Sequence, residues 1–151
     1  MAITEIDIQI ERLPGAHDIP IPTYATIGAV GMDLCAAVSD EIVLRPGERK
    51  LIPTGYKFAI PPGFEGQVRA RSGSALKKGL GIPNSPGTID SDYRGELGVI
   101  MINWGDEPQR ILRGDRIAQL VIAPVIRAKL TVSNCLDKTI RGDGGFGHSG
   151  T

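Results

Sequence analysis

The most regular feature of this 151-residue chain is a set of short segments in which apolar and polar residues alternate. Such alternation is typical of β-strands, because successive side chains of a strand point to opposite faces. A run that is apolar at nearly every position indicates a strand buried on both faces, and residues 97–102 form such a run. We therefore predict strands at residues 6–10, 56–60, 68–70, 97–102, 116–125 and 129–132.

Turn signals separate these segments. The chain contains LPG, RPGE, IPTG, IPPG, SPG, WGDEP and RGD, all rich in the residues that favour turns. Many short strands at this spacing predict an all-β sandwich, jelly roll or barrel. Gly and Pro make up about a fifth of the chain, with 20 and 11 residues, and leave little room for long helices. The one helix that the sequence predicts is short and lies near residues 74–80.

Composition narrows the classes of partner. Lys and Arg together number 17, as do Asp and Glu, and this balance argues against a non-specific nucleic-acid binder. Cys35 and Cys135 lack the spacing of a zinc site, and we expect free, buried thiols in a reducing compartment. The acidic, alternating start is unlike a signal peptide, and the longest apolar run is too short to cross a bilayer. We expect a cytoplasmic protein that binds neither nucleic acid nor membrane.

The apolar periodicity stops near residue 134. We therefore divide the chain into one folded domain, residues 1–134, and a C-terminal arm, residues 135–151. Five glycines among residues 141–150 make the arm flexible. A frayed tail would explain the glycines, but a mere spacer has no need of Arg141, Phe146 and His148.

The arm also contains a G-x-G-x-x-G match, at residues 142–147. A dinucleotide-binding fingerprint follows a strand, opens a helix and precedes an acidic residue by about twenty positions. The chain ends four residues after this match, so that interpretation fails. What remains is an anion-binding capacity, since glycines let backbone N–H groups approach phosphate oxygens and Arg141 adds a bidentate donor.

A second candidate anion site is the RSG sequence that precedes the predicted helix. Arg71, Ser72 and Gly73 combine a guanidinium, a hydroxyl and free N–H groups at a helix start, which suits a phosphate. The alternative is that Ser72 caps the helix beside a solvated basic face.

Asp33 lies within GAVGMDLCA, next to a segment that is expected to be buried. An Asp after glycine is common in turns. The alternative is a water-mediated contact with Mg²⁺, which prefers several waters and few carboxylates.

The stretch NSPGTIDSDYRGEL, residues 84–97, has turn residues, two carboxylates and a tyrosine. Asp90 could orient and deprotonate a water, a role worth roughly 10²–10⁴-fold in rate. Tyr93 could stack on a sugar or a base, whereas Asp92 and Arg94 are expected to form a surface pair. Taken alone, the stretch fits a charged hairpin tip equally well.

Five blocks in this order give the chain a specific resemblance. They are GAVGMDLCA, RSGSALKKG, NSPGTIDSDYRGEL, RGDRIAQLVI and RGDGGFGHSG. Over nearly its whole length the chain resembles the trimeric deoxyuridine triphosphate nucleotidohydrolases, the dUTPases, which have five such ordered motifs.

The resemblance implies a fold and a reaction. The fold would be a single-domain β jelly roll with one short helix and a flexible glycine-rich arm, assembled as a homotrimer whose three sites are each built from three chains. The reaction would be the Mg²⁺-assisted hydrolysis of dUTP to dUMP and pyrophosphate, which keeps uracil out of DNA and supplies dUMP for thymidylate synthesis.

The resemblance also assigns roles by position. Asn84 and the neighbouring Gly87, Thr88 and Ile89 would read the uracil edge. Tyr93 would stack on the deoxyribose and exclude a 2′-hydroxyl, and Asp90 would hold the attacking water in line with the α-phosphorus. The remaining substrate and metal contacts would be Arg71, Ser72, Gly73 and Gln119 on the α- and β-phosphates, Phe146 on the uracil, Arg141, His148 and Ser149 near the γ-phosphate, Gly147 beside them, and Asp33 on Mg²⁺ through water.

Two rival functions remain at this stage. A dCTP deaminase, or a bifunctional deaminase–diphosphatase, needs an acid/base group at the pyrimidine C4. Glu96 is the nearest candidate, and we expect it to lie past the tight turn and to fall short. A non-catalytic nucleotide-binding protein would have lost the base, yet Asp90 is present.

Overall fold

The computed structural model describes residues 5–145, which form ten strands and one helix. In chain order the elements are β1 (Gln9–Arg12), β2 (Gly31–Cys35), β3 (Ile42–Leu44), β4 (Arg49–Ala59), β5 (Phe64–Arg69), α1 (Ser72–Lys78), β6 (Leu80–Gly81), β7 (Gly87–Ile89), β8 (Glu96–Asn103), β9 (Gln109–Ile111) and β10 (Arg116–Pro124).

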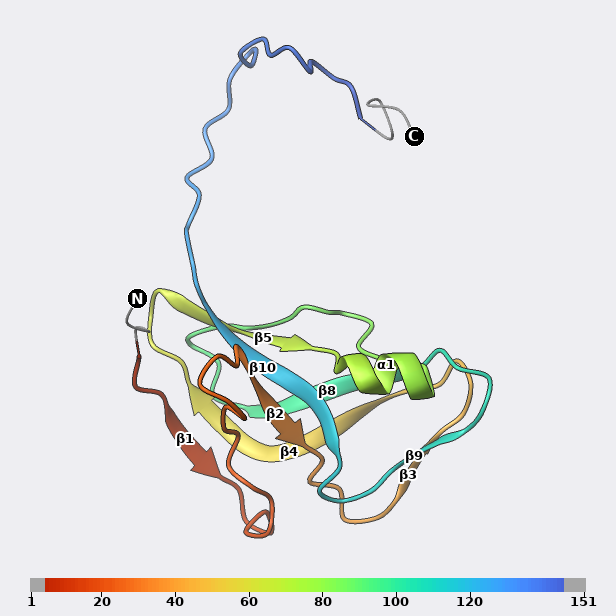
Figure 1. Cartoon of the computed structure of the whole chain (residues 1–151). Coiled ribbons are helices and arrows are strands. Elements are labelled where there is room, and N and C mark those ends of the chain that lie inside the picture. The colour runs from red at the N-terminus through yellow and green to blue at the C-terminus, as the bar shows by residue number, and fades with distance from the viewer. Residues whose placement is uncertain (1–4, 146–151) are drawn as a thin grey trace.

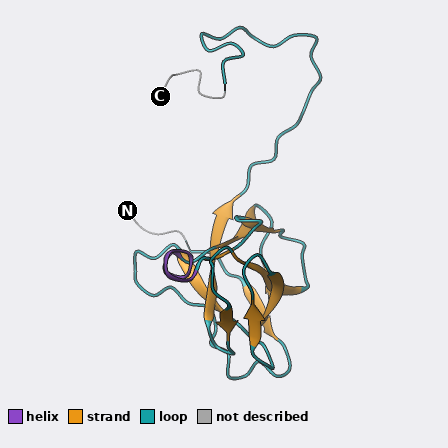
Figure 2. Cartoon of the chain, turned by 90° about the vertical axis from the view of Figure 1, so that its right-hand side faces the viewer, coloured by secondary structure: helices purple, strands orange, loops and turns teal. Residues whose placement is uncertain are grey.

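The strands form two four-stranded sheets, with the orders β1-β4-β8-β6 and β2-β10-β5-β7, and a two-stranded ribbon of β3 and β9. Every pairing is antiparallel, and most neighbours within the two larger sheets are distant in sequence (Figure 1). The prediction of an all-β, jelly-roll-like single domain with one short helix is therefore confirmed. Figure 2 shows the helix end-on beside the strands.

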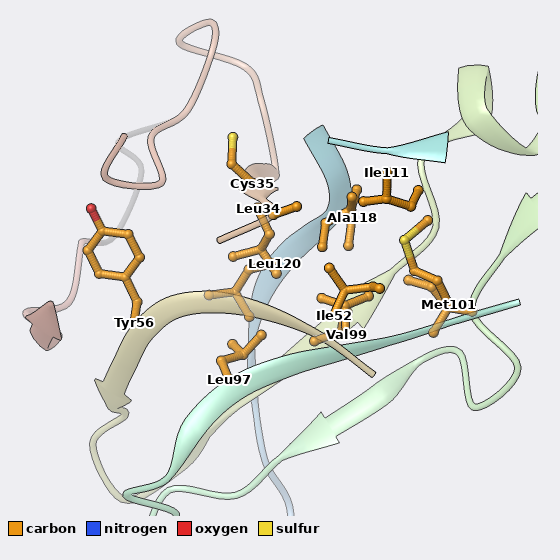
Figure 3. Packing of buried hydrophobic residues seen from close by; sticks show 14 of the residues in the cluster. Leu34, Cys35, Ile52, Tyr56, Leu97, Val99, Met101, Ile111, Ala118 and Leu120 are labelled. Carbon is orange, nitrogen blue, oxygen red and sulfur yellow. The ribbon is translucent and has the colours of Figure 1, made fainter. Parts of the chain in front are cut away.

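The core lies between the two larger sheets (Figure 3). Leu34 and Leu120 approach it from one sheet, and Ile52, Leu97 and Val99 approach it from the other, all with at most 1% of their surface exposed. Burial of each such side chain contributes about 1.5–3 kcal/mol, so a chain of this length can be stable without a disulfide.

Both cysteines of the described chain are free, but only Cys35 is buried. Burial raises the pKa of the Cys35 thiol, which keeps it protonated. The expectation of a buried thiol was wrong for Cys135, which lies in the exposed segment after β10.

The predicted strands at 97–102 and 116–125 are present as β8 and β10. The helix lies two residues earlier than predicted, because Gly79 adopts a left-handed conformation with φ of 63° and ends α1 at Lys78. Leu80, predicted as helical, begins β6 instead.

The IPTG sequence, predicted as a turn, lies inside β4. The register of β4 against β8 shifts between Pro53 and Lys57, so this segment is a bulge in a continuous strand. Gly55 has φ of 76° there, which is the conformational freedom that made the sequence resemble a turn.

The predicted strand at residues 129–132 is absent from the described chain. Beyond Pro124, residues 125–145 form no strand and run away from the sheets (Figure 1). No helix within residues 5–145 has the length and apolar character needed to span a membrane.

Candidate active site

The turn between β7 and β8 is closed by its own hydrogen bonds. The Tyr93 N–H donates to the Asp90 carbonyl at 3.1 Å, and the Arg94 guanidinium donates to the carbonyls of Ser91 and Tyr93 at 2.7 and 2.8 Å. The predicted Asp92–Arg94 pair is not among the ion pairs of the described residues, because Arg94 bonds to the backbone instead. These bonds give the turn a defined shape.

An open cavity of about 460 Å³ lies beside this turn. Five of the predicted site residues line it: Asn84, Thr88, Ile89, Asp90 and Tyr93. Five further residues of the lining were not predicted as part of the site: Leu51, Pro53, Glu96, Gly98 and Ile100.

The cavity combines an apolar wall with a polar edge. Leu51 of β4 and Ile100 of β8 are cross-strand partners and supply apolar surface, whereas Asn84 and Asp90 supply polar groups. Apolar walls with a few placed polar groups are the usual design of a site for a small flat ligand. The pairing of Leu51 with Ile100 depends on strand register, so the local sequence carries no signal for it.

Gly87 sets the shape of the polar edge. It is buried in β7, and a Cβ atom there would lie 3.1 Å from the Asn84 side-chain nitrogen and 3.3 Å from Val68 Cβ. The absence of a side chain at Gly87 therefore lets the Asn84 amide lie close to the β7 backbone.

Asp90 is exposed at the rim of the cavity. Among the hydrogen bonds and ion pairs of residues 5–145, none engages its carboxylate; only its backbone carbonyl accepts, from the Tyr93 N–H. The carboxylate is thus available to a water molecule. Tyr93 is 45% exposed, and its hydroxyl donates to the Glu96 carbonyl at 3.0 Å.

A second cluster forms around Asp33 on β2. Its carboxylate accepts from Arg71 Nε at 3.0 Å, from Arg116 Nη1 at 3.4 Å and from Gln119 Nε2 at 3.5 Å. The fold therefore brings together Asp33, Arg71 and Gln119, which the sequence predicted as separate contacts to metal and phosphates. Arg116 was not predicted, although it stands in the same RGDRIAQ sequence as Gln119.

Ser72 and Gly73 begin α1 and are exposed beside this cluster. The N-cap position is occupied by Arg71, with no side-chain capping bond. The alternative in which Ser72 caps the helix was therefore wrong, and its hydroxyl is not used in that way.

The side chains around Asp33 could contact a metal ion only through water. No group of three His, Cys, Asp or Glu side chains within residues 5–145 could hold a metal ion. Two guanidinium groups already face the Asp33 carboxylate, so a dication would not bind there by itself. The set fits an Mg²⁺ ion that arrives with a polyphosphate, keeps most of its waters and meets Asp33 through one of them.

No residue of the described part of the C-terminal segment, 125–145, lines either cavity. Arg141 is exposed, its Nε donates to the Gly144 carbonyl at 2.7 Å, and it lines neither described cavity. Phe146, Gly147, His148 and Ser149 lie outside the described residues.

The residues predicted to contact the nucleoside and those predicted to contact the phosphates line different cavities. Asn84, Asp90 and Tyr93 line the first cavity, whereas Arg71 and Gly73 line a second cavity of about 330 Å³. The second cavity also contains Lys77, Lys78, Arg110 and Arg116, which makes it cationic.

Comparison with known proteins gives the family. Residues 17–150, almost the whole chain, match the dUTPase family. The chain belongs to the dUTPase family.

Curated relatives named deoxyuridine 5′-triphosphate nucleotidohydrolase cover the same length. The protein from Methylocella silvestris is 56% identical over 147 residues, which cover 96% of this chain and 92% of the relative. That from a Thermoanaerobacter species is 51% identical over 145 residues, with 96% and 98% covered.

Solved dUTPase structures match the fold. The Staphylococcus bacteriophage 80alpha dUTPase, solved with dUpNHpp, has a TM-score of 0.86 at 28% identity, covering 96% of this chain and 99% of that one. A variant dUTPase from phage phi11 of S. aureus, which shows the coordination of a structural Mg(II) ion, has a TM-score of 0.78 at 25% identity, covering 88% and 100%.

Proposed function

We propose that this protein hydrolyses dUTP to dUMP and pyrophosphate. The observation that carries the proposal is the cavity beside the β7–β8 turn, where Asn84, Asp90 and Tyr93 meet. Membership of the dUTPase family and the names of the relatives at 51% and 56% identity support it. In the cell, the reaction would keep uracil out of DNA and supply dUMP for thymidylate synthesis.

Uracil would lie in the first cavity, with its hydrogen-bonding edge toward Asn84 and the backbone of Gly87, Thr88 and Ile89. Cytosine presents a donor at C4 and an acceptor at N3, the reverse of uracil, so it would leave polar groups of the site without partners. The close approach of the Asn84 side chain to Gly87 supports a narrow polar edge, and we expect the cavity there to exclude the thymine methyl group.

Tyr93 would stack on the deoxyribose. Its exposed ring at the cavity rim and its hydroxyl bond to Glu96 support a fixed position of this kind. A ring held there leaves no room for a 2′-hydroxyl and so favours dUTP over UTP.

Asp90 would accept a hydrogen bond from the attacking water and then take its proton. The water oxygen forms a bond to the α-phosphorus as the bond from that phosphorus to the α–β bridging oxygen breaks, and pyrophosphate leaves. Such a reaction depends mainly on in-line positioning and charge neutralisation. Arg71, Ser72, Gly73 and Gln119 would bind the α- and β-phosphates.

Mg²⁺, when bound with the triphosphate, would supply additional neutralisation of phosphate charge. Asp33 would reach it through water, and the two arginines beside Asp33 would hold the phosphates in the same place.

The separation of the two clusters supports a homotrimer with shared sites. We assign the cavity of each site to one chain, its Arg71 cluster to a second and its arm to a third. Leu130 and Val132, in the segment between β10 and the arm, are 92% and 99% exposed in the single chain, as expected of side chains that another copy covers. Residues 135–151 would close over the substrate, with Phe146 on the uracil and Arg141, His148 and Ser149 near the γ-phosphate.

The decisive assay supplies dUTP, UTP, dCTP and dTTP with Mg²⁺ and measures pyrophosphate and ammonia. We expect pyrophosphate from dUTP alone and no ammonia from any substrate. The absence of pyrophosphate from dUTP would overturn the proposal, and ammonia from dCTP would favour the deaminase.

A further inference from the structure

The bulge in β4 borders the first cavity, since Pro53 at its start and Glu96 opposite its end both line that cavity. Between the cross-strand pairs Pro53–Gly98 and Lys57–Glu96, three residues of β4 oppose a single residue of β8. Regular ladder hydrogen bonds cannot form across such a mismatch. Gly55, in the middle of the bulge, has φ of 76°, and a Cβ atom there would overlap the Ala16 side chain.

Two hydrogen bonds that involve side chains replace the missing ladder bonds. The buried Thr54 hydroxyl donates to the Leu97 carbonyl at 2.6 Å. The Gly55 N–H donates to the Glu96 carboxylate at 2.8 Å. Glu96 lines the cavity, and its carboxylate accepts from the backbone of the bulge.

The backbone of Glu96 holds Tyr93. The Glu96 carbonyl accepts the Tyr93 hydroxyl at 3.0 Å. Between these two residues, Gly95 leaves space for the ring, because a Cβ atom there would overlap the Tyr93 hydroxyl. The position of the tyrosine ring thus depends on the residue that the bulge anchors.

We propose that Glu96 is a positioning residue for sugar selection. The Gly55 N–H fixes the Glu96 carboxylate, and this in turn fixes the backbone carbonyl of Glu96. That carbonyl holds the Tyr93 ring over the position that the sugar 2′ carbon would occupy. This inference rests on the proposed function, in which Tyr93 contacts the deoxyribose. It also gives Glu96 a role other than acid/base chemistry at C4.

The test compares kcat/KM for dUTP and UTP in purified variants. Glu96→Ala leaves the Gly55 N–H without its acceptor, and we expect a roughly tenfold loss of dUTP/UTP selectivity. Most of that loss should come from a higher kcat/KM for UTP, with kcat for dUTP changed by less than about threefold because Asp90 is untouched. Glu96→Gln retains an oxygen that can accept the Gly55 N–H, and we expect selectivity within about twofold of wild type.

Thr54→Val provides the structural control, because it removes the other hydrogen bond of the bulge without removing a contact to Tyr93. We expect a lower melting temperature and unchanged selectivity. If Glu96→Ala fails to fold, Gly95→Ala, which displaces the Tyr93 hydroxyl directly, should show the same loss of selectivity.

Tyr93→Ala separates this inference from the proposed function. Unchanged selectivity in that variant would overturn the role of Tyr93 itself. If Tyr93→Ala loses selectivity but Glu96→Ala and Gly95→Ala do not, the positioning role is wrong and the proposed function stands. Equal loss of selectivity in Glu96→Gln and Glu96→Ala, or in Thr54→Val and Glu96→Ala, would also overturn the positioning role.

Discussion

The cavity beside the β7–β8 turn and the segment after β10 differ in how much of their structure one chain supplies. The cavity takes its walls from β4, β7 and β8, and its turn is closed by one backbone hydrogen bond and by two from the Arg94 guanidinium. In residues 125–145, by contrast, Ile126, Leu130 and Val132 are all more than 90% exposed. Burial of each such side chain would contribute about 1.5–3 kcal/mol, which supports the proposal that this segment packs against another copy of the chain. On the proposed function, one chain would supply the whole cavity that receives the uracil, whereas a second copy would supply the segment that closes the site.

The largest effect is expected at Asp90, the proposed catalytic base at the rim of the first cavity. Asp90→Asn keeps the shape of the side chain but removes its ability to take a proton, and we expect kcat to fall roughly 10²–10⁴-fold with dUTP still bound. Asp92→Asn is the matched control, since Asp92 is exposed and does not line the cavity, and it should remain close to wild type. Pyrophosphate release and dUTP titration by calorimetry measure the two quantities. Equal turnover in Asp90→Asn and wild type would remove the assignment of the base.

The second prediction distinguishes closure of the arm over the substrate from assembly of the trimer. Deletion of residues 141–151 removes the arm beyond the exposed apolar side chains, and we expect kcat/KM to fall by about 10²-fold through loss of substrate closure. The oligomer should persist, as measured by light scattering after gel filtration. A monomeric product would contradict this division of the segment.

The third effect concerns the apolar part of the same segment. Leu130→Asp places a charge where we expect burial against another copy, and it should weaken the trimer by several kcal/mol. Leu76→Asp is the comparison: Leu76 is also exposed, at 87%, but it lies on α1 of the folded body, so this variant shows whether a charge at any exposed leucine has the same effect. Sedimentation velocity over a range of concentrations gives the result, and an unchanged trimer in Leu130→Asp would mean that this side chain is exposed in the assembly too.

The smallest effect lies in the folded body, away from both regions. Arg113 donates to both Asp18 oxygens, and this holds the pKa of the Asp18 carboxyl at about 2, below its ordinary value of 3.8. Because the pKa is lowered in the folded state, the stabilisation is present above about pH 4 and is lost as the pH falls towards 2. Asp18→Asn should lower the melting temperature at pH 6 by no more than about 4 °C, and most of the difference should be lost by pH 2, where about half of the folded carboxyl groups are protonated. A difference as large at pH 2 as at pH 6 would show that the charge of Asp18 is not its cause.

The sequence predicted the parts of the fold that local pattern determines. Alternation and apolar runs identified β8 and β10, because burial on a sheet face is a period-two property. The bulge at Gly55 was misread as a turn, since Pro, Thr and Gly have the same local preferences in both settings and only pairing with β8 distinguishes them. The strand expected at residues 129–132 has no partner in the described chain, and a strand cannot form without one.

For the site, too, the sequence predicted what lies close together along the chain but not what depends on strand pairing. Asn84, Asp90 and Tyr93 lie in one continuous stretch, so the sequence pointed to them together. Leu51 and Glu96 could not be placed in the lining from sequence, because their positions depend on the register of β4 against β8 and on the bulge. The convergence of Arg71 and Gln119 on Asp33 likewise depends on pairing of β10 with both β2 and β5.

Mixing two inactive variants tests most directly the claim that one chain supplies the base and another the closure. Asp90→Asn lacks the base but has the arm, and the chain deleted for residues 141–151 has the base but lacks the arm. If each site draws these parts from different chains, refolding an equal mixture should restore about a quarter of wild-type sites. The account predicts that activity well above either variant alone. Activity that stays at the mean of the two variants, in an assembly shown to contain both, would contradict it.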